Sequence, residues 1–139
     1  MKIAVIIVRS LLGLAFIFFG LNGFLNFMKP PPEMVFPQHA IEFNTALMAT
    51  GYFKGIGAFE LVGGLLLLTG RFSALGLALL MPVLVNIVFY HTFIDHQGWQ
   101  PGALCAALAL FLLFYYRAAF AGLVRSSASA EGGLTFPER

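Results

Sequence analysis

The chain has 139 residues, of which 60% are hydrophobic and only 10% are charged. Soluble domains are about 45–50% apolar and about 25% charged, so this composition is typical of a one-domain membrane protein. The formal net charge is +2, and no cluster of Lys and Arg could follow a phosphate backbone, which argues against a nucleic-acid partner. Cys105 is the only cysteine, so neither an internal disulfide nor a C-x-x-C redox pair can form.

Four apolar stretches are long enough to cross a lipid bilayer, which takes about 20 residues per helix. They cover residues 3–27, 51–69, 73–93 and 102–124. We therefore predict an all-α membrane protein whose residues 1–125 form a single four-transmembrane-helix bundle.

The connection between the first two stretches has its own pattern. It contains three prolines at 30–32, which we expect to end the first helix. Residues 39–48 follow with an amphipathic arrangement that places Ala40, Phe43 and Leu47 on one side. This pattern predicts a short external amphipathic helix between the first and second spans.

Positive charges are shared unequally between the predicted loops. If both termini are inside, six Lys and Arg residues lie on the cytoplasmic side: Lys2, Arg9, Arg71, Arg117, Arg125 and Arg139. Only Lys29 and Lys54 lie outside. Because the Lys/Arg bias of short loops sets orientation, we predict that both termini are cytoplasmic. Residues 126–139 are rich in Ser, Ala and Gly and are predicted to be a disordered cytoplasmic tail.

A carboxylic acid lies in the middle of the second stretch, within the sequence FELVGGLLLLTG. Helical spacing puts Glu60 on the same face as Gly57, Gly63 and Gly64, and small residues mark the face where membrane helices approach closely. Counting back from Arg71 at about 1.5 Å per residue places Glu60 near the bilayer midplane. An ionised carboxylate there needs a partner or takes up a proton, so Glu60 is the first candidate for function.

The first predicted helix offers a partner for Glu60. Arg9 lies about 9 Å inside the cytoplasmic end of that helix and shares a stripe with Gly13 and Gly20, two expected packing positions. Its side chain could form a structural ion pair with Glu60, or it could extend back to the lipid headgroups. Two interpretations of Glu60 remain: half of an ion pair that holds helices together, or a site for a ligand or a proton.

The third stretch carries polar residues and a proline in the sequence MPVLVNIVFYHTF. Pro82 removes a helical hydrogen bond and is expected to kink the helix and shape its packing. Asn86 and Tyr90 share its face, so the Asn86 amide could bind Glu60, a freed carbonyl or a ligand, or join two helices.

His91 is turned away from Asn86 by about 140°. The spacing from His91 to His96 is one residue longer than a helical turn, and no third strong ligand is evident. No metal site is therefore predicted. The candidates for ligand binding are Glu60, Asn86, Tyr52, Tyr90 and His91.

Several segments follow one another in an order that points to a known family. They are ALMATGYF before the second helix, E-x-x-G-G-L-L-L-L-x-G-R-F within it, and P-V-L-V-N-I in a third helix that ends in F-Y-H-T-F. Over about residues 5–122 the chain resembles the DoxX family of small bacterial membrane proteins. The matching positions are Arg9, Gly20, Gly51, Tyr52, Glu60, Gly64, Pro82, Asn86 and His91.

The resemblance implies a four-helix bundle in the bacterial inner membrane. Members of the wider family have been linked to sulfur oxidation with quinone as acceptor and to redox-stress complexes with soluble partners, while others look like assembly factors. It therefore implies a redox partner protein, soluble or in the membrane.

Three functions are compatible with these residues and with the resemblance. The first is a redox-associated accessory subunit that binds a quinone-like or other lipid-soluble molecule through Glu60 or Asn86, beside Tyr52 or Tyr90. The second is a non-enzymatic assembly or stabilising subunit whose glycine-rich helix faces dock partner helices. The third is a small proton-coupled transporter, most readily a homo-oligomer. No catalytic motif is present, and the sequence does not decide whether the protein is an enzyme.

Overall fold

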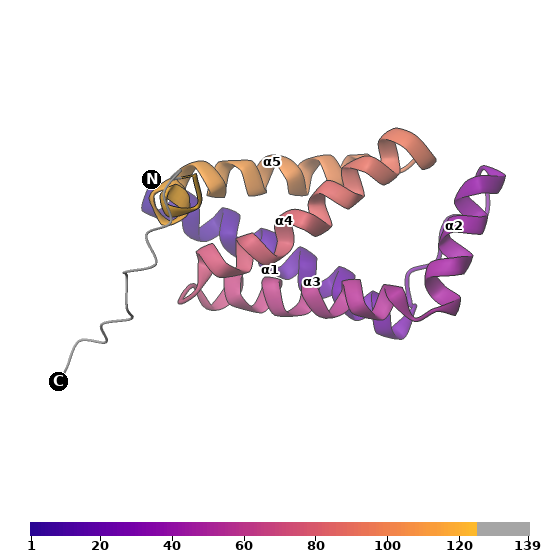
Figure 1. Ribbon diagram of the computed structural model, residues 1–139, viewed down its shortest axis with the longest axis horizontal. Helices are drawn as coiled ribbons and strands as arrows, with labels where there is room; N and C mark the ends of the chain where they lie inside the picture. The colour runs from indigo at the N-terminus through magenta and orange to yellow at the C-terminus, as the bar shows by residue number, and fades with distance from the viewer. Residues whose placement is uncertain (125–139) are drawn as a thin grey trace.

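The computed structural model describes residues 1–124, and every regular element in that range is a helix (Figure 1). The main helices are α1 (Lys2–Leu25), α2 (Gln38–Ala49), α3 (Tyr52–Thr69), α4 (Ser73–Phe89) and α5 (Gln100–Tyr115). A π-helical turn, η1 (Tyr90–Ile94), continues α4, while α6 (Arg117–Phe120) and a 3-10 turn, η2 (Ala121–Val124), follow α5. The all-α prediction is confirmed for this range. The predicted tail, residues 126–139, lies outside it.

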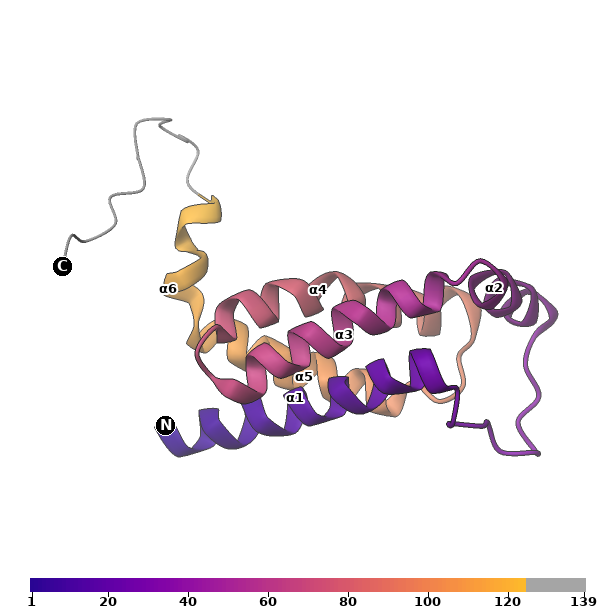
Figure 2. The ribbon, with the colours of Figure 1, turned by 90° about the horizontal axis from the view of Figure 1, so that it is seen from below.

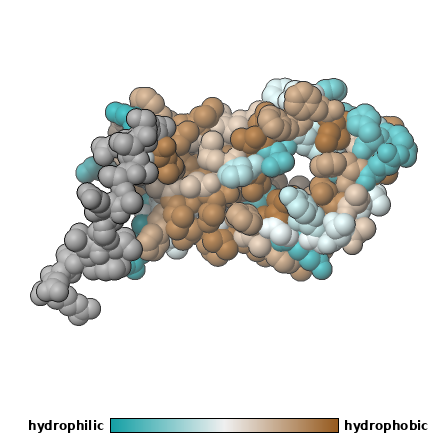
Figure 3. Space-filling view, viewed as in Figure 1, coloured by the Kyte–Doolittle hydropathy of each residue, from teal (hydrophilic) through white to brown (hydrophobic). Residues whose placement is uncertain are grey.

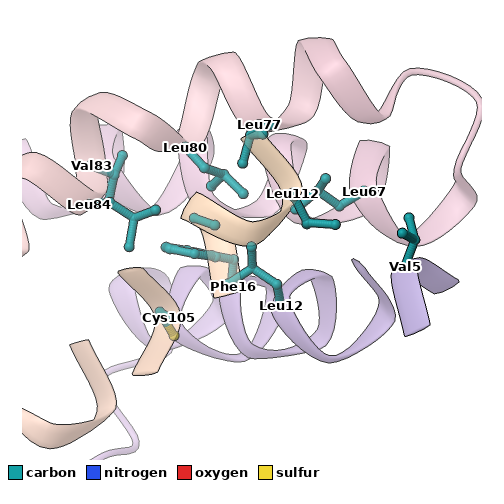
Figure 4. Close-up of a cluster of buried hydrophobic side chains, with 11 residues drawn as sticks. Val5, Leu12, Phe16, Leu67, Leu77, Leu80, Val83, Leu84, Cys105 and Leu112 are labelled. Carbon is teal, nitrogen blue, oxygen red and sulfur yellow. The ribbon is translucent and has the colours of Figure 1, made fainter. Parts of the chain in front are cut away.

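Four helices surround one core. α1 packs along α3, α3 along α4, α4 along α5, and α5 along α1, so the contacts close into a ring. Figure 2 shows these helices side by side, with α2 at one end of the bundle and α6 turned away at the other. The core is apolar because each helix contributes leucine, valine or aromatic side chains (Figure 4): Val5, Leu12, Phe16, Leu67, Leu77, Leu80, Val83, Leu84, Cys105, Ala109 and Leu112.

The bundle has the lengths and surface of a multi-pass membrane protein. Within the described residues, three helices are long and apolar enough to cross a membrane: Lys2–Leu25, Tyr52–Thr69 and Ser73–Ile94. Gln100–Tyr115 meets the same test only when taken together with Arg117–Leu123, and the two are bent by 78°. Figure 3 shows hydrophobic residues over the middle of the visible face and hydrophilic residues toward its ends. Such an apolar band is the surface that lipid chains would cover.

The fourth apolar stretch does not form the single helix predicted for residues 102–124. α5 ends at Tyr115, and the chain then turns by 78°. The Nη1 atom of Arg117 donates to the carbonyl of Phe114 at 3.1 Å, and the guanidinium lies 4.7 Å from the centroid of the Phe114 ring. Because the last carbonyls of a helix lack partners and carry partial negative charge, a cation placed there stabilises the end of α5.

The first helix also ends earlier than predicted. The prolines at 30–32 do not end it, because Asn26 already adopts a left-handed conformation with φ 47°. Its backbone N–H donates to the carbonyl of Asn22, and the Asn22 side chain accepts a bond of 2.7 Å from the backbone N–H of Met28. Asparagine tolerates left-handed backbone better than most residues, so two asparagines end α1 before the prolines are reached.

The amphipathic segment forms α2, as its pattern predicted. Ala40 is fully buried, and the Phe43 ring lies 6.0 Å from the ring of Tyr90 at the end of α4. The Nδ2 atom of Asn44 donates to the Tyr90 hydroxyl at 2.7 Å, and the Nε2 atom of His39 bonds to the carbonyl of Ile94 at 2.7 Å. These contacts hold α2 across the end of the bundle that lies opposite the N-terminus (Figure 1).

Candidate functional site

Glycines bring α1 and α3 into backbone contact. A Cβ atom added to Gly64 would lie 2.7 Å from the carbonyl oxygen of Gly13, and one added to Gly57 would lie 2.8 Å from that of Gly20. Gly63 faces α4 instead, where a Cβ atom would lie 2.6 Å from the side chain of Leu80. The glycine face of α3 is therefore divided between two neighbouring helices.

Glu60 lies between these contacts on α3. Gly57 and Gly64 on one side of it meet α1, and Gly63 on the other side meets α4, so its side chain points into the ring of helices. Consistent with this direction, Glu60 is one of the buried residues of α3.

The carboxyl of Glu60 has no partner. The residue is 8% exposed, yet no hydrogen bond or ion pair from any described residue reaches either of its oxygens. In the described part of the chain, only one side-chain polar atom is both fully buried and without a partner, and it is the Nε atom of Arg9. Both oxygens of Glu60 therefore keep some exposed surface. Glu60 therefore offers two oxygens that no described residue bonds to and that are not completely enclosed.

The helices diverge at the level of this carboxyl. Near the hairpin α3 and α4 are in contact, since a Cβ atom on Gly76 would lie 2.8 Å from the carbonyl oxygen of Gly63. Glu60 lies three residues before Gly63, about one turn farther from the hairpin. With distance from the hairpin, α4 moves away from α3 toward α5 (Figure 1). In the same view, Figure 3 shows an opening in the surface in the region between α2, α3 and the end of α4, with hydrophilic residues beside it.

Arg9 does not pair with Glu60. Its guanidinium lies against Gly70 at the end of α3, so close that a Cβ atom there would overlap it. Gly70 is ten residues from Glu60, or about 15 Å along a helix, which is beyond the reach of the arginine side chain. The predicted ion pair is thus absent, although both residues are described, and the reason is that α1 and α3 pack in a register that places Arg9 at the hairpin.

Asn86 and Tyr90 form hydrogen bonds with groups other than the Glu60 carboxyl. The Nδ2 atom of Asn86 donates to the carbonyl of Pro82 in its own helix at 3.0 Å, and the residue is exposed. Tyr90 accepts its hydrogen bond from Asn44, which leaves its hydroxyl proton without an acceptor among the described residues. Of the two, only Tyr90, the first residue of η1, has a hydrogen bond to α2.

Tyr52 and His91 lie away from Glu60. Tyr52 is the first residue of α3, is 60% exposed, and is eight residues, or about 12 Å, from Glu60 along the helix. His91 belongs to η1 and lines a separate cavity between the end of α4 and α5. Among the described residues, no three His, Cys, Asp or Glu side chains are grouped so that they could hold a metal ion.

Two residues near these groups were missed by the sequence analysis. Cys105 was considered only for disulfides, although its spacing from Gly102 and Ala109 is helical and marks the inner face of α5. Asn44 is absent from the candidates taken from the sequence, whereas in the structure its amide donates to the Tyr90 hydroxyl. No local pattern distinguishes a polar side chain that meets water from one that meets a distant tyrosine.

Comparison of the chain with protein-family models, curated proteins and solved structures gives no match.

Proposed function

We propose that this chain is a DoxX-like protein of the bacterial inner membrane with four membrane spans and both termini in the cytoplasm. Three spans are α1, α3 and α4 with η1, and the fourth is α5 completed by the bent segment that follows it. The closed ring of four helices supports a fourth span, because α5 packs beside both α1 and α4. The excess of Lys and Arg in the loops on the N-terminal side supports the orientation.

Within the membrane, the protein is a redox-associated accessory subunit that binds a quinone-like or other lipid-soluble molecule with a polar head. The observation that carries this proposal is the unpartnered, reachable carboxyl of Glu60 among apolar helices. Burying a polar group without a hydrogen bond has an unfavourable free energy of desolvation. A ligand that forms a hydrogen bond with that group recovers this free energy when it binds. A protonated carboxyl donates to a carbonyl oxygen, and an ionised one accepts from a hydroxyl.

The surrounding residues give the ligand a direction. Its polar head meets Glu60, and its apolar tail leaves the bundle where α3 and α4 diverge. Tyr90 stands further along this path, and its free hydroxyl proton is a second donor. Cys105 belongs to the buried apolar core that the four helices share.

The test is native mass spectrometry of gently solubilised protein, with wild type beside Glu60→Gln and Glu60→Leu. We expect wild type to carry a small molecule that both variants lose, and Glu42→Gln to keep it, because Glu42 is exposed and bonds only to Gln38. The mass of the molecule would identify its chemistry. Retention of the molecule by Glu60→Leu would contradict the proposal.

Thermal stability of the same variants separates a binding role from a structural one. Glu60→Leu replaces an unpartnered carboxyl with an apolar side chain of similar size, so we expect the empty protein to be at least as stable as empty wild type. A marked loss of stability in Glu60→Leu would instead make Glu60 a structural residue.

One observation favours the alternative of an assembly or stabilising subunit. Asn86 is exposed on an otherwise apolar face of α4, and its Oδ1 atom has no hydrogen bond from the described residues. A partner helix could satisfy it. The glycines expected to dock such helices are already occupied within the α1–α3 contact. Affinity purification from native membranes would favour this alternative if a partner is recovered with wild type and lost with Asn86→Leu.

A further inference from the structure

We propose a second ligand site, independent of Glu60, in the cavity between η1 and α5. It takes a lipid-soluble molecule whose head is a single aromatic ring with a hydroxyl group. The site lies at the end of the bundle that α2 covers, on the side of α4 that faces α5.

The size and walls of the cavity favour one flat ring. Its volume is about 220 Å³, and it is lined by Ile87, Val88, His91, Thr92, Trp99, Gly102 and Ala103. A cavity of about 150 Å³ can hold benzene, whereas drug-sized ligands occupy about 300–1,000 Å³. Trp99 contributes an aromatic wall on which a ring can pack. The missing side chain of Gly102 keeps the space between Ile87 and His91 open, since a Cβ atom there would lie 2.7 Å from Ile87.

His91 supplies the hydrogen-bonding group. Its Nδ1 atom lies 3.0 Å from the carbonyl oxygen of Asp95. A carbonyl oxygen only accepts, so Nδ1 carries a proton, and in the tautomer with that single proton Nε2 is an acceptor. The Cδ2 atom next to Nε2 faces Gly102 across the cavity, and Nε2 has no partner among the described residues. An acceptor in an apolar cavity selects a ligand that brings a hydroxyl donor.

The backbone around His91 is held in place by its own hydrogen bonds. The π-helical turn is closed by the backbone N–H of Asp95, which donates to the carbonyl of Tyr90 at 2.9 Å. The Nδ1 atom of His96 donates to the carbonyl of His91 at 3.0 Å, and the Asp95 carboxylate, 2% exposed, accepts from the backbone N–H of Gln97. π-Helical turns are rare and frequently lie at functional sites. This turn orients the His91 ring before any ligand arrives.

The experiment uses the fluorescence of Trp99, which is the only tryptophan of the chain. The full-length protein in detergent is titrated with 4-heptylphenol and, separately, with its methyl ether, which has the same ring but no hydroxyl donor. We expect a saturable change with the phenol and at least about tenfold weaker binding of the ether, as the loss of one hydrogen bond predicts. Equal affinities for the two probes, or a change that never saturates, would overturn the proposal without any variant.

Two variants locate the effect. In His91→Phe the phenol should bind as weakly as the ether, because the acceptor is gone. Glu42→Gln, at an exposed residue outside both sites, should leave both titrations unchanged. The Glu60 site has its own test by native mass spectrometry, so failure of this site and failure of the Glu60 site are distinguishable. A His91→Phe protein that still prefers the phenol over the ether would show that His91 is not the acceptor.

Discussion

Glycines, which have no side chain, determine how closely α1 and α3 approach. Gly13 and Gly64 face one another so tightly that each would place a Cβ atom within 2.8 Å of the opposite carbonyl oxygen. In a bilayer there is no hydrophobic drive between helices, so this close packing is what holds the pair together. The same contact leaves Glu60 pointing inward, because it lies between Gly57 and Gly64 on α3.

The first prediction at this scale concerns Gly64. Gly64→Ala should destabilise the protein by about 1–3 kcal/mol, because the obstacle to the new methyl group is backbone that can move only if the helices separate. The measurement is unfolding in mixed micelles with increasing denaturing detergent. Gly55→Ala is the matched control, since it lies on the same helix and nothing is within 4 Å of its added Cβ atom. Equal effects of the two substitutions would contradict the role of the close contact.

At the scale of elements, α2 is attached to the bundle by a few polar contacts. Only Ala40 of this helix is buried, and its side-chain bonds reach η1 through Asn44 and His39. An element with so few buried contacts opens more easily than the helices below it. α2 is therefore the part of the bundle whose hydrogen bonds we expect to open first.

The corresponding prediction concerns the bond between Asn44 and Tyr90. Tyr90→Phe should increase backbone hydrogen exchange throughout α2 and leave α1 unchanged. A double-mutant cycle with Asn44→Ala should give a coupling energy of about 0.5–1.5 kcal/mol. Gln38→Ala is the control, because Gln38 is on the same helix and bonds only to Glu42. Additive effects of Tyr90→Phe and Asn44→Ala would show that the bond does not hold α2.

At the scale of the whole molecule, two features of the surface define its place in a membrane. Apolar side chains cover the middle of the bundle, and the bend after α5 turns the chain aside where Tyr115, Tyr116 and Arg117 meet. Aromatic and cationic residues of this kind are favoured at the boundary between lipid and water. The bend thus separates α5 from the short segment that would complete an apolar span.

Orientation is tested by labelling single cysteines in intact cells with a maleimide that does not cross membranes. Lys29→Cys, in the loop before α2, should react in intact cells, and Lys2→Cys should react only after the cells are opened. Both positions are exposed, and the native Cys105 is buried and should stay unlabelled. The opposite labelling pattern would mean that the termini lie outside.

The sequence by itself determined the helices, the approximate apolar spans and the glycine face that carries Glu60. These features depend on composition and on a period of 3.6 residues, both of which are local. It did not reveal where side chains meet between helices. Arg9 and Glu60 are far apart because α1 and α3 pack with a particular axial shift, and no periodicity within one helix contains that shift.

Contacts between distant residues were decided only by the tertiary structure. The bond from Asn44 to Tyr90 joins residues 46 positions apart. The bend after Tyr115 occurs where the sequence contains no proline or glycine. Tyr116 and Arg117 stand there, but such residues also occur inside straight helices, so they do not by themselves predict a bend. Burial of a polar side chain and the direction of a helix end depend on what the rest of the chain packs against them. This is why the unpartnered state of Glu60 could be seen only in the folded molecule.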